Sequence, residues 1–198
     1  MHATTLSFLT AVVLAAFSAD ASTPAIPEEF ARALISAERS SEITPAEDLY
    51  AELLGIWDVD VRDRQDNGSF RSSRGEWLFV RTLEGRAVQD VWINPPRGER
   101  RSDGDKSVNR YGTTVRTFDP NARRWQVTFL NPVFGTFDVL IARREGRSIV
   151  QEGTRPNGQK IRWVFSDITD RAFHWTGEAL QPDGTWLLEA EFFGHRRR

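Results

Sequence analysis

Few side chains in this 198-residue chain could do acid–base chemistry, and His174 is the first candidate. We predict that Glu191 lies directly across a hairpin from it. A histidine beside a carboxylate can act as a general base. The alternative is an exposed pair on the outer wall of a sheet, which would contribute at most about 1 kcal/mol. His174 and Glu191 are therefore the catalytic candidates, and an exposed pair is the competing interpretation.

Composition and motifs exclude several function classes. The chain has no cysteine and three histidines, which excludes thiol catalysis and leaves little material for a metal site. It also lacks a Gly-x-Ser-x-Gly elbow, a phosphate loop and a His-Glu-x-x-His motif. Lys and Arg number 26 against 28 Asp and Glu, so there is no basic excess for nucleic acid. We expect binding rather than catalysis, without a metal or cofactor.

Four polar residues are candidate anchors for a ligand inside the fold. Gln89 and Asp90 are adjacent in an apolar strand, so one of them must face the less polar side. A polar group that points into a barrel needs a partner or a ligand. Arg116 is a third candidate, and Glu152 is the fourth. A two-residue turn would place Glu152 beside Trp163, and a three-residue turn would place it beside Arg162; an outward position is the alternative for all four.

Aromatic residues are the most abundant binding material. The chain has seven Trp and 13 Phe. These rings either line a cavity for a small apolar molecule or fill a solid core. The wall candidates are Trp77, Trp92, Trp125, Phe129, Trp163 and Trp175.

From Gly55 onward, apolar and polar residues alternate with the period of a β-strand. Gly-, Asn- and Asp-rich turns separate the alternating segments, which predicts an antiparallel meander. Closing such a sheet into a barrel hides its edges. The ten segments are Gly55–Val61, Gly75–Leu83, Ala87–Ile93, Tyr111–Phe118, Arg124–Asn131, Phe137–Arg143, Ser148–Thr154, Lys160–Ser166, Phe173–Leu180 and Thr185–Phe193.

Two connections carry more detailed predictions. In the last hairpin, a four-residue loop would pair Leu180 with Thr185 and Phe173 with Phe192, which puts the apolar side chains on one face. The charged connection Asn94–Arg110 is either a lid over the barrel mouth or a solvated insertion.

The N-terminus reads as an export signal. The apolar run Phe8–Phe17 precedes Ala19-Asp20-Ala21, so we expect a signal peptide over 1–21 with cleavage near Ala21. No comparable run follows, so we expect no membrane span in the mature protein. The preference for Arg over Lys indicates a bacterial genome, and the destination is then the periplasm or the medium.

The mature chain divides into two parts. Residues 22–54 are predicted to be helical, with one or two short helices. Apolar residues from Phe30 to Ala37 have helical spacing, and Thr44 with Glu47 forms a capping box for a second helix. Residues 55–198 form the predicted β-barrel domain.

A short helix followed by Gly55-Ile56-Trp57 and a β-meander resembles the lipocalin-like (calycin) barrels, closest to bacterial DUF1579-type domains, over about residues 50–195. The resemblance implies that Gly55 and Trp57 close the barrel floor. It also implies a late basic partner for Trp57, which would be Arg196, Arg197 or Arg198. Ten strands are more typical of a fatty-acid-binding type of barrel than of an eight-stranded one.

The chain also has a general resemblance to barrel haem proteins such as nitrobindin, which implies that His174 could bind haem iron.

Three functions follow from the sequence. The first is an exported β-barrel that binds a small apolar molecule. The second is an enzyme on the same barrel that uses His174 with nearby carboxylates. The third is a barrel without a ligand that serves as an envelope or interaction module.

Overall fold

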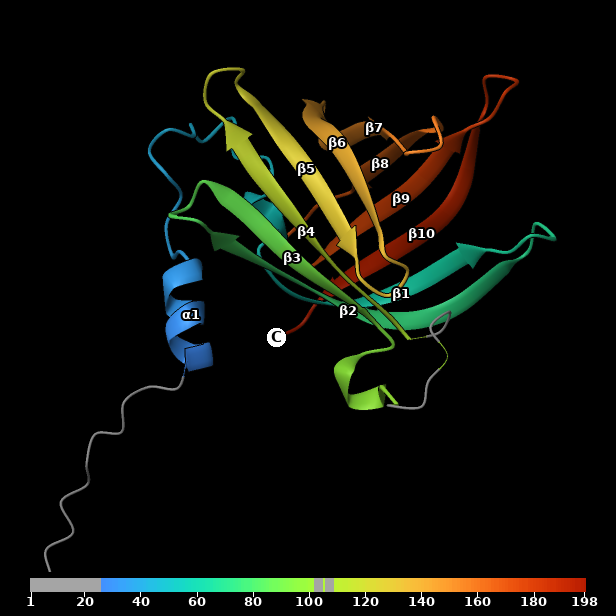
Figure 1. Cartoon of the computed structure of the whole chain (residues 1–198), viewed down its shortest axis with the longest axis horizontal. Helices are drawn as coiled ribbons and strands as arrows, with labels where there is room; N and C mark the ends of the chain where they lie inside the picture. The colour runs from blue at the N-terminus through green and yellow to red at the C-terminus, as the bar shows by residue number, and fades with distance from the viewer. Residues whose placement is uncertain (1–25, 102–104, 106–108) are drawn as a thin grey trace, which may run out of the picture.

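The computed structural model describes residues 26–101, 105 and 109–198. It is mainly β: ten antiparallel strands follow one another in sequence order, and the first pairs with the last to close a barrel (Figure 1). This confirms the predicted fold. The strands are β1 Gly55–Arg64, β2 Phe70–Thr82, β3 Ala87–Asn94, β4 Arg110–Asp119, β5 Arg124–Asn131, β6 Thr136–Glu145, β7 Ser148–Thr154, β8 Lys160–Ser166, β9 Ala172–Leu180 and β10 Trp186–Arg196.

Strand β1 shows how the sequence builds the barrel wall. Its side chains alternate between buried Trp57, Val59 and Val61 and exposed Asp58 and Asp60. Successive side chains of a strand point to opposite faces of the sheet, so this alternation separates the interior from the outer wall.

No helix in the described part of the chain is long and apolar enough to span a membrane.

The segment before the barrel contains less helix than the sequence predicts. It holds one α-helix, α1 (Ile26–Leu34), and a single 3₁₀ turn, η1 (Ala51–Leu53). Only half of the predicted capping box forms: the Thr44 amide donates to Glu47 Oε2 at 3.1 Å, but the Glu47 amide donates to the Thr44 carbonyl instead of the Thr44 hydroxyl, and only turns follow. The reason is tertiary: the Glu47 carbonyl accepts a hydrogen bond from Trp125 Nε1 at 2.6 Å instead of continuing a helix. The predicted signal peptide, 1–21, lies outside the described residues.

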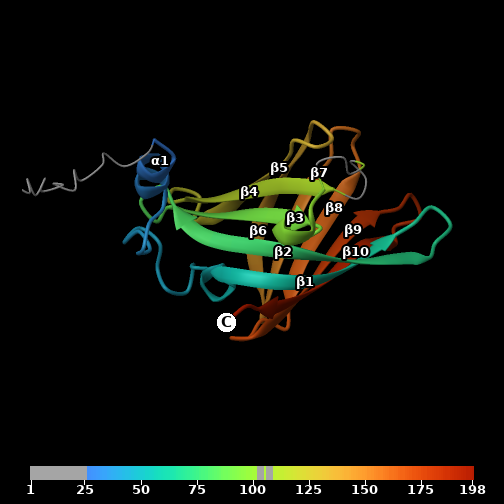
Figure 2. The ribbon, with the colours of Figure 1, turned by 90° about the horizontal axis from the view of Figure 1, so that it is seen from below.

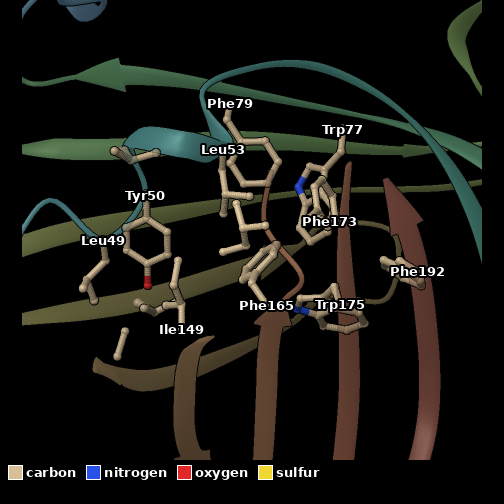
Figure 3. Close-up of a cluster of buried hydrophobic side chains, with 14 of the residues drawn as sticks. Leu49, Tyr50, Leu53, Trp77, Phe79, Ile149, Phe165, Phe173, Trp175 and Phe192 are labelled. Atoms are coloured by element: carbon tan, nitrogen blue, oxygen red, sulfur yellow. The ribbon is translucent and has the colours of Figure 1, made fainter. Parts of the chain in front are cut away.

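Residues 43–54 close one end of the barrel. Four apolar side chains of this segment are buried against the interior: Ile43, Leu49, Tyr50 and Leu53. Figure 3 shows Leu49, Tyr50 and Leu53 beside Phe79 and Ile149 of the barrel wall.

The connections at this end join β2 to β3, β4 to β5, β6 to β7 and β8 to β9, so the other end is the mouth. Figure 2 shows α1 beside one end of the barrel, where Leu83 N–H donates to the Leu34 carbonyl at 3.0 Å.

The register of the last hairpin differs from the prediction. Leu180 pairs with Trp186 instead of Thr185, and a bulge between Leu188 and Ala190 adds one further residue of shift. Beyond the bulge the offset is two residues, so Phe192 lies opposite Trp175. The predicted register is therefore wrong, but an even offset keeps both rings on the interior face, as predicted.

Candidate functional site

The open half of the barrel encloses a cavity of about 630 Å³. Its lining includes parts of the β5–β6 and β7–β8 turns, which places the opening at the mouth. Six aromatic rings form much of its wall: Trp77, Trp92, Phe129, Trp163, Trp175 and Phe192. Five of these are predicted wall residues, and Phe192 is an addition.

The rings hold one another in place around the cavity. Phe192 stacks on Trp92 and on Trp175, with centroid distances of 4.8 and 4.4 Å. Trp175 contacts Trp163 at 6.0 Å, and Trp163 contacts Phe129 at 5.7 Å. Each contact joins different strands, and aromatic pairs of this kind add about 0.5–1.5 kcal/mol beyond their buried area. The apolar wall is therefore a continuous, mutually supported surface.

Trp125 belongs to the closed end and does not line the cavity. Its ring meets Tyr50 edge to face at 5.2 Å, and its indole nitrogen is held by the Glu47 carbonyl. The sequence could not separate Trp125 from the other rings, because its position depends on where residues 43–54 pack.

A buried ion pair lies in the interior. Arg116 Nη1 lies 2.6 Å from Asp90 Oδ2, and both side chains are at most 1% exposed. The Thr114 amide donates to Asp90 Oδ1 at 3.0 Å, which fixes the carboxylate from its other side. Arg116 is part of the cavity lining, so two of the four predicted polar anchors, Asp90 and Arg116, meet inside the barrel.

Aromatic rings and a tyrosine hydroxyl surround this arginine. Its guanidinium lies over the rings of Tyr50 and Phe79, at 5.0 and 5.3 Å. Tyr50 donates a hydrogen bond to Gln151 Oε1 at 3.1 Å. Burial raises the pKa of the Tyr50 hydroxyl well above its usual range, with the Arg116 charge opposing this. Tyr50 therefore stays protonated and serves as a donor.

Several buried N–H groups of residues that line the cavity have no acceptor among the described residues. They include Nε of Arg116 and the indole Nε1 atoms of Trp77 and Trp175, and these three atoms are enclosed by protein atoms instead of being open to the cavity. Figure 3 shows both indole nitrogens turned toward the side of Phe79 and Phe165. Arg116 lies over these same two rings, so the unpaired donors gather in one part of the interior. Buried donors normally have a partner, so this group has unused hydrogen-bonding capacity.

Charged residues at the mouth are mostly paired. Arg110 holds Asp63 through two hydrogen bonds of 3.0 and 2.8 Å. Arg155 holds Glu189 in the same way, at 2.9 and 2.7 Å. Burial raises the pKa of Asp138, and the nearby Arg155 opposes this shift. Sequence reasoning missed these residues, because Asp63 and Arg110 are far apart in sequence and Glu189 lies at the bulge.

Gln89 and Glu152 point away from the cavity. Gln89 donates to Thr113 Oγ1 at 3.2 Å on the outer side of the wall. Glu152 pairs in register with Arg162, as the three-residue turn predicts, but its carboxylate binds Arg143 at 2.8 Å. These two candidates occupy the outward position that the sequence left open.

His174 also lies on the outer wall. Its Nε2 is 3.0 Å from Glu191 Oε1, and Arg62 donates to the same carboxylate at 2.7 Å. The ring stacks on Phe193 at 4.7 Å and is not part of the cavity lining. The predicted pairing with Glu191 therefore exists, on the outer surface. His174 presents no nitrogen to the cavity, so its position does not fit a haem ligand inside the barrel.

The connection from β3 to β4 is partly described. It contains one 3₁₀ turn, η2 (Arg97–Glu99). The Glu76 carboxylate accepts hydrogen bonds from the backbone amide and the side chain of Arg97. Residues 102–104 and 106–108 lie outside the described residues, and so does that part of the predicted lid.

Among the described residues, no group of three or more His, Asp or Glu side chains is placed to hold a metal ion.

Solved structures share this lipocalin-like barrel. Rv2717c from M. tuberculosis is 13% identical, with a TM-score of 0.52 and coverage of 79% of this chain and 99% of that chain. The S-type phycobiliprotein lyase CPES from Guillardia theta is 11% identical, with a TM-score of 0.51 and coverage of 79% and 95%. At these identities the likeness shows the fold alone. No family model matches the chain, and no curated protein matches it, so membership of the DUF1579 type stays a prediction.

Proposed function

We propose that this protein is an exported β-barrel that binds one small, largely apolar molecule in its cavity. The observation that carries the proposal is the 630 Å³ space lined by Trp and Phe rings. Cavities of about 300–1,000 Å³ with mainly apolar walls and a few polar groups are typical of small-molecule sites. A molecule that fills it would gain roughly 25 cal/mol for each Å² of apolar surface removed from water.

The two other functions have less support. The enzyme hypothesis needs His174 to reach a substrate, but its ring lies outside the cavity and is engaged by Glu191. A barrel without a ligand would be expected to fill its interior with side chains, and this one leaves a large space. Binding is therefore the function that the geometry supports best.

Native mass spectrometry of the protein purified from its host tests the binding proposal. We expect the mature barrel to carry a single noncovalent small-molecule adduct, or to take up one equivalent of the neutral apolar dye Nile red after delipidation. A barrel that carries no adduct and takes up no dye would overturn the proposal.

The export part of the proposal has a separate test. Intact mass and N-terminal sequencing of the purified protein should show a chain that begins near Ser22, recovered from the periplasm or the medium. A chain that keeps residues 1–21 and stays with the cytoplasmic fraction would overturn export, and it would leave the binding proposal standing.

A further inference from the structure

One of the charged side chains that line the cavity lacks a partner of opposite charge. The three arginines of the lining each hold one carboxylate at 2.6–2.8 Å, and the pairs are Arg110–Asp63, Arg116–Asp90 and Arg155–Glu189. A fourth carboxylate, that of Asp138, also belongs to the lining. Within the part of the chain that the structure describes, this carboxylate has no hydrogen bond and no ion pair. The cavity therefore carries one negative charge that no arginine balances.

The position of Asp138 on strand β6 turns its carboxylate inward. The adjacent Phe137 and Val139 are exposed on the outer side, whereas Leu140 is buried. Successive side chains of a strand point to opposite faces, so Asp138 faces the interior together with Leu140. In the sheet register Asp138 lies directly opposite Phe129 of β5, which is also part of the cavity lining. The carboxylate therefore lies beside the aromatic wall, close to the β5–β6 turn at the mouth.

The charges around Asp138 favour a positive partner. Burial raises the pKa of Asp138, the Arg155 charge opposes this shift, and the Glu189 charge adds to it. Arg155 is committed to Glu189 through hydrogen bonds of 2.9 and 2.7 Å, so Asp138 does not have this cation to itself. A cationic group of a ligand would supply the missing counter-charge. An anionic group at the same place would meet two carboxylates around one arginine.

The aromatic wall suits the same kind of group. Phe129, which lies opposite Asp138, contacts Trp163 with a centroid distance of 5.7 Å. Ammonium groups are attracted electrostatically to aromatic rings, and most strongly to tryptophan. At the mouth such a group keeps part of its hydration, which limits the cost of taking it out of water. The apolar body of the ligand can then lie against the other rings of the wall.

From these observations we infer that the cavity selects amphipathic organic cations, molecules with an ammonium head group and an apolar body, over neutral and anionic molecules of the same size. Asp138 binds the head group, with the rings of Phe129 and Trp163 nearby. The inference rests on the proposed binding function and adds the charge of the ligand.

Three probes with different head groups test the inference. Decyltrimethylammonium, 1-decanol and decanoate carry a cation, a neutral hydroxyl and a carboxylate on a linear alkyl chain. Their affinities are measured by displacement of Nile red at neutral pH and low salt, below the concentrations at which they form micelles. We expect the cation to bind at least about threefold more tightly than the alcohol and at least about tenfold more tightly than the carboxylate, because only the cation gains a counter-charge from Asp138.

A matched pair of variants assigns the effect to Asp138. Asp138→Asn removes the charge and keeps the shape of the side chain, so it should weaken the cation about three- to tenfold, leave 1-decanol unchanged and strengthen decanoate. Asp66→Asn makes the same change of charge at an exposed position of the β1–β2 turn, outside the cavity lining. It should leave all three affinities within about twofold of wild type. The order of the three probes on wild type needs no variant, so it decides where Asp138→Asn fails to fold.

The outcomes separate this inference from the function on which it rests. If 1-decanol or decanoate binds wild type as tightly as the cation, the selectivity for cations is overturned but a binding barrel remains. If a folded Asp138→Asn variant keeps the wild-type preference, or if Asp66→Asn loses as much of it, the role given to Asp138 is overturned. If neither Nile red nor any of the three probes binds the wild-type protein, the proposed function itself fails.

Discussion

The guanidinium of Arg196 lies 4.1 Å from the ring of Trp57, across the floor of the barrel. The same guanidinium donates to three backbone carbonyls, those of Glu52, Leu54 and Asp170, at 2.5–2.6 Å. It therefore joins the N-terminal segment, the first strand and the β8–β9 connection at one point. Of the three C-terminal arginines that the sequence offered as partners of Trp57, Arg196 is the one in contact.

We expect Arg196→Ala to lower the free energy of unfolding by about 2–4 kcal/mol, from the lost cation–π contact and three charge-assisted hydrogen bonds. Urea unfolding followed by tryptophan fluorescence measures it. Arg198→Ala is the matched control, since Arg198 is exposed, and it should stay within about 0.5 kcal/mol of wild type. Equal effects of the two substitutions would contradict the role given to Arg196.

Gly55 is required beside this contact. Its φ is +126°, and a Cβ there would lie 2.5 Å from Arg196 Nη1. Gly55→Ala should therefore destabilise the barrel by at least about 1–3 kcal/mol, through backbone strain and displacement of the arginine. The same unfolding experiment checks it, and a variant as stable as wild type would show that the arginine moves aside freely.

Glu76 should make stability depend on pH in the acid range. Its buried carboxylate accepts hydrogen bonds from Arg97, and from Arg197 at 3.2 Å, and these lower its pKa from 4.5 to about 2. A lowered carboxylate pKa stabilises the fold above the unfolded-state value and loses that contribution as pH falls toward the folded-state value. The contribution, at most about 3 kcal/mol, should therefore disappear between about pH 4.5 and pH 2.

The Glu76→Gln variant should be less stable than wild type at neutral pH, and the difference should shrink across that acid range. Glu38→Gln, at an exposed position, is the control and should follow the wild-type curve. A stability difference that stays constant from neutral pH to about pH 2 would exclude this linkage.

The Asp90–Arg116 pair should show strong coupling. Asp90→Ala leaves a buried cation without a partner, which is expected to cost about 3–5 kcal/mol. Replacing both residues, as in Asp90→Leu with Arg116→Met, should cost less than the sum of the single changes. A double-mutant cycle by urea unfolding measures the coupling, and additive effects would mean that the two charges act independently.

His174→Ala should leave ligand binding unchanged, because the ring lies on the outer wall. The checks are Nile red affinity and a titration with haem. Any Soret change that wild type shows on haem addition should persist in the variant. A Soret band that disappears with His174 would instead support haem binding through this residue.

The barrel was predictable from the sequence because its strands and hairpins are specified by residues that are neighbours in the sequence. Alternation such as Trp57-Asp58-Val59, together with glycine-containing turns, specifies strand order and hairpins without long-range knowledge. The second helix was predicted wrongly for the complementary reason. Glu47 accepts a hydrogen bond from the Thr44 amide, as a capping box predicts, but packing against Trp125 overrides the helix.

The candidate site was predictable in its composition and less so in its geometry. Alternation showed that either Gln89 or Asp90 must face inward, but only the register with β4 brings Arg116 to Asp90. The bulge at Glu189 could not be read from the sequence, and it is this residue that holds Arg155 at the mouth. Contacts set by register and bulges require the closed barrel.

The most direct test of the account is a Nile red titration of wild type and of Ala190→Trp, a substitution that fills the cavity from its wall. We predict that wild type binds one dye per barrel and that Ala190→Trp binds at least about tenfold more weakly while keeping a wild-type melting temperature. Ala122→Trp, at an exposed turn, should bind like wild type. Unchanged dye binding by a folded Ala190→Trp variant would contradict a ligand site inside the barrel.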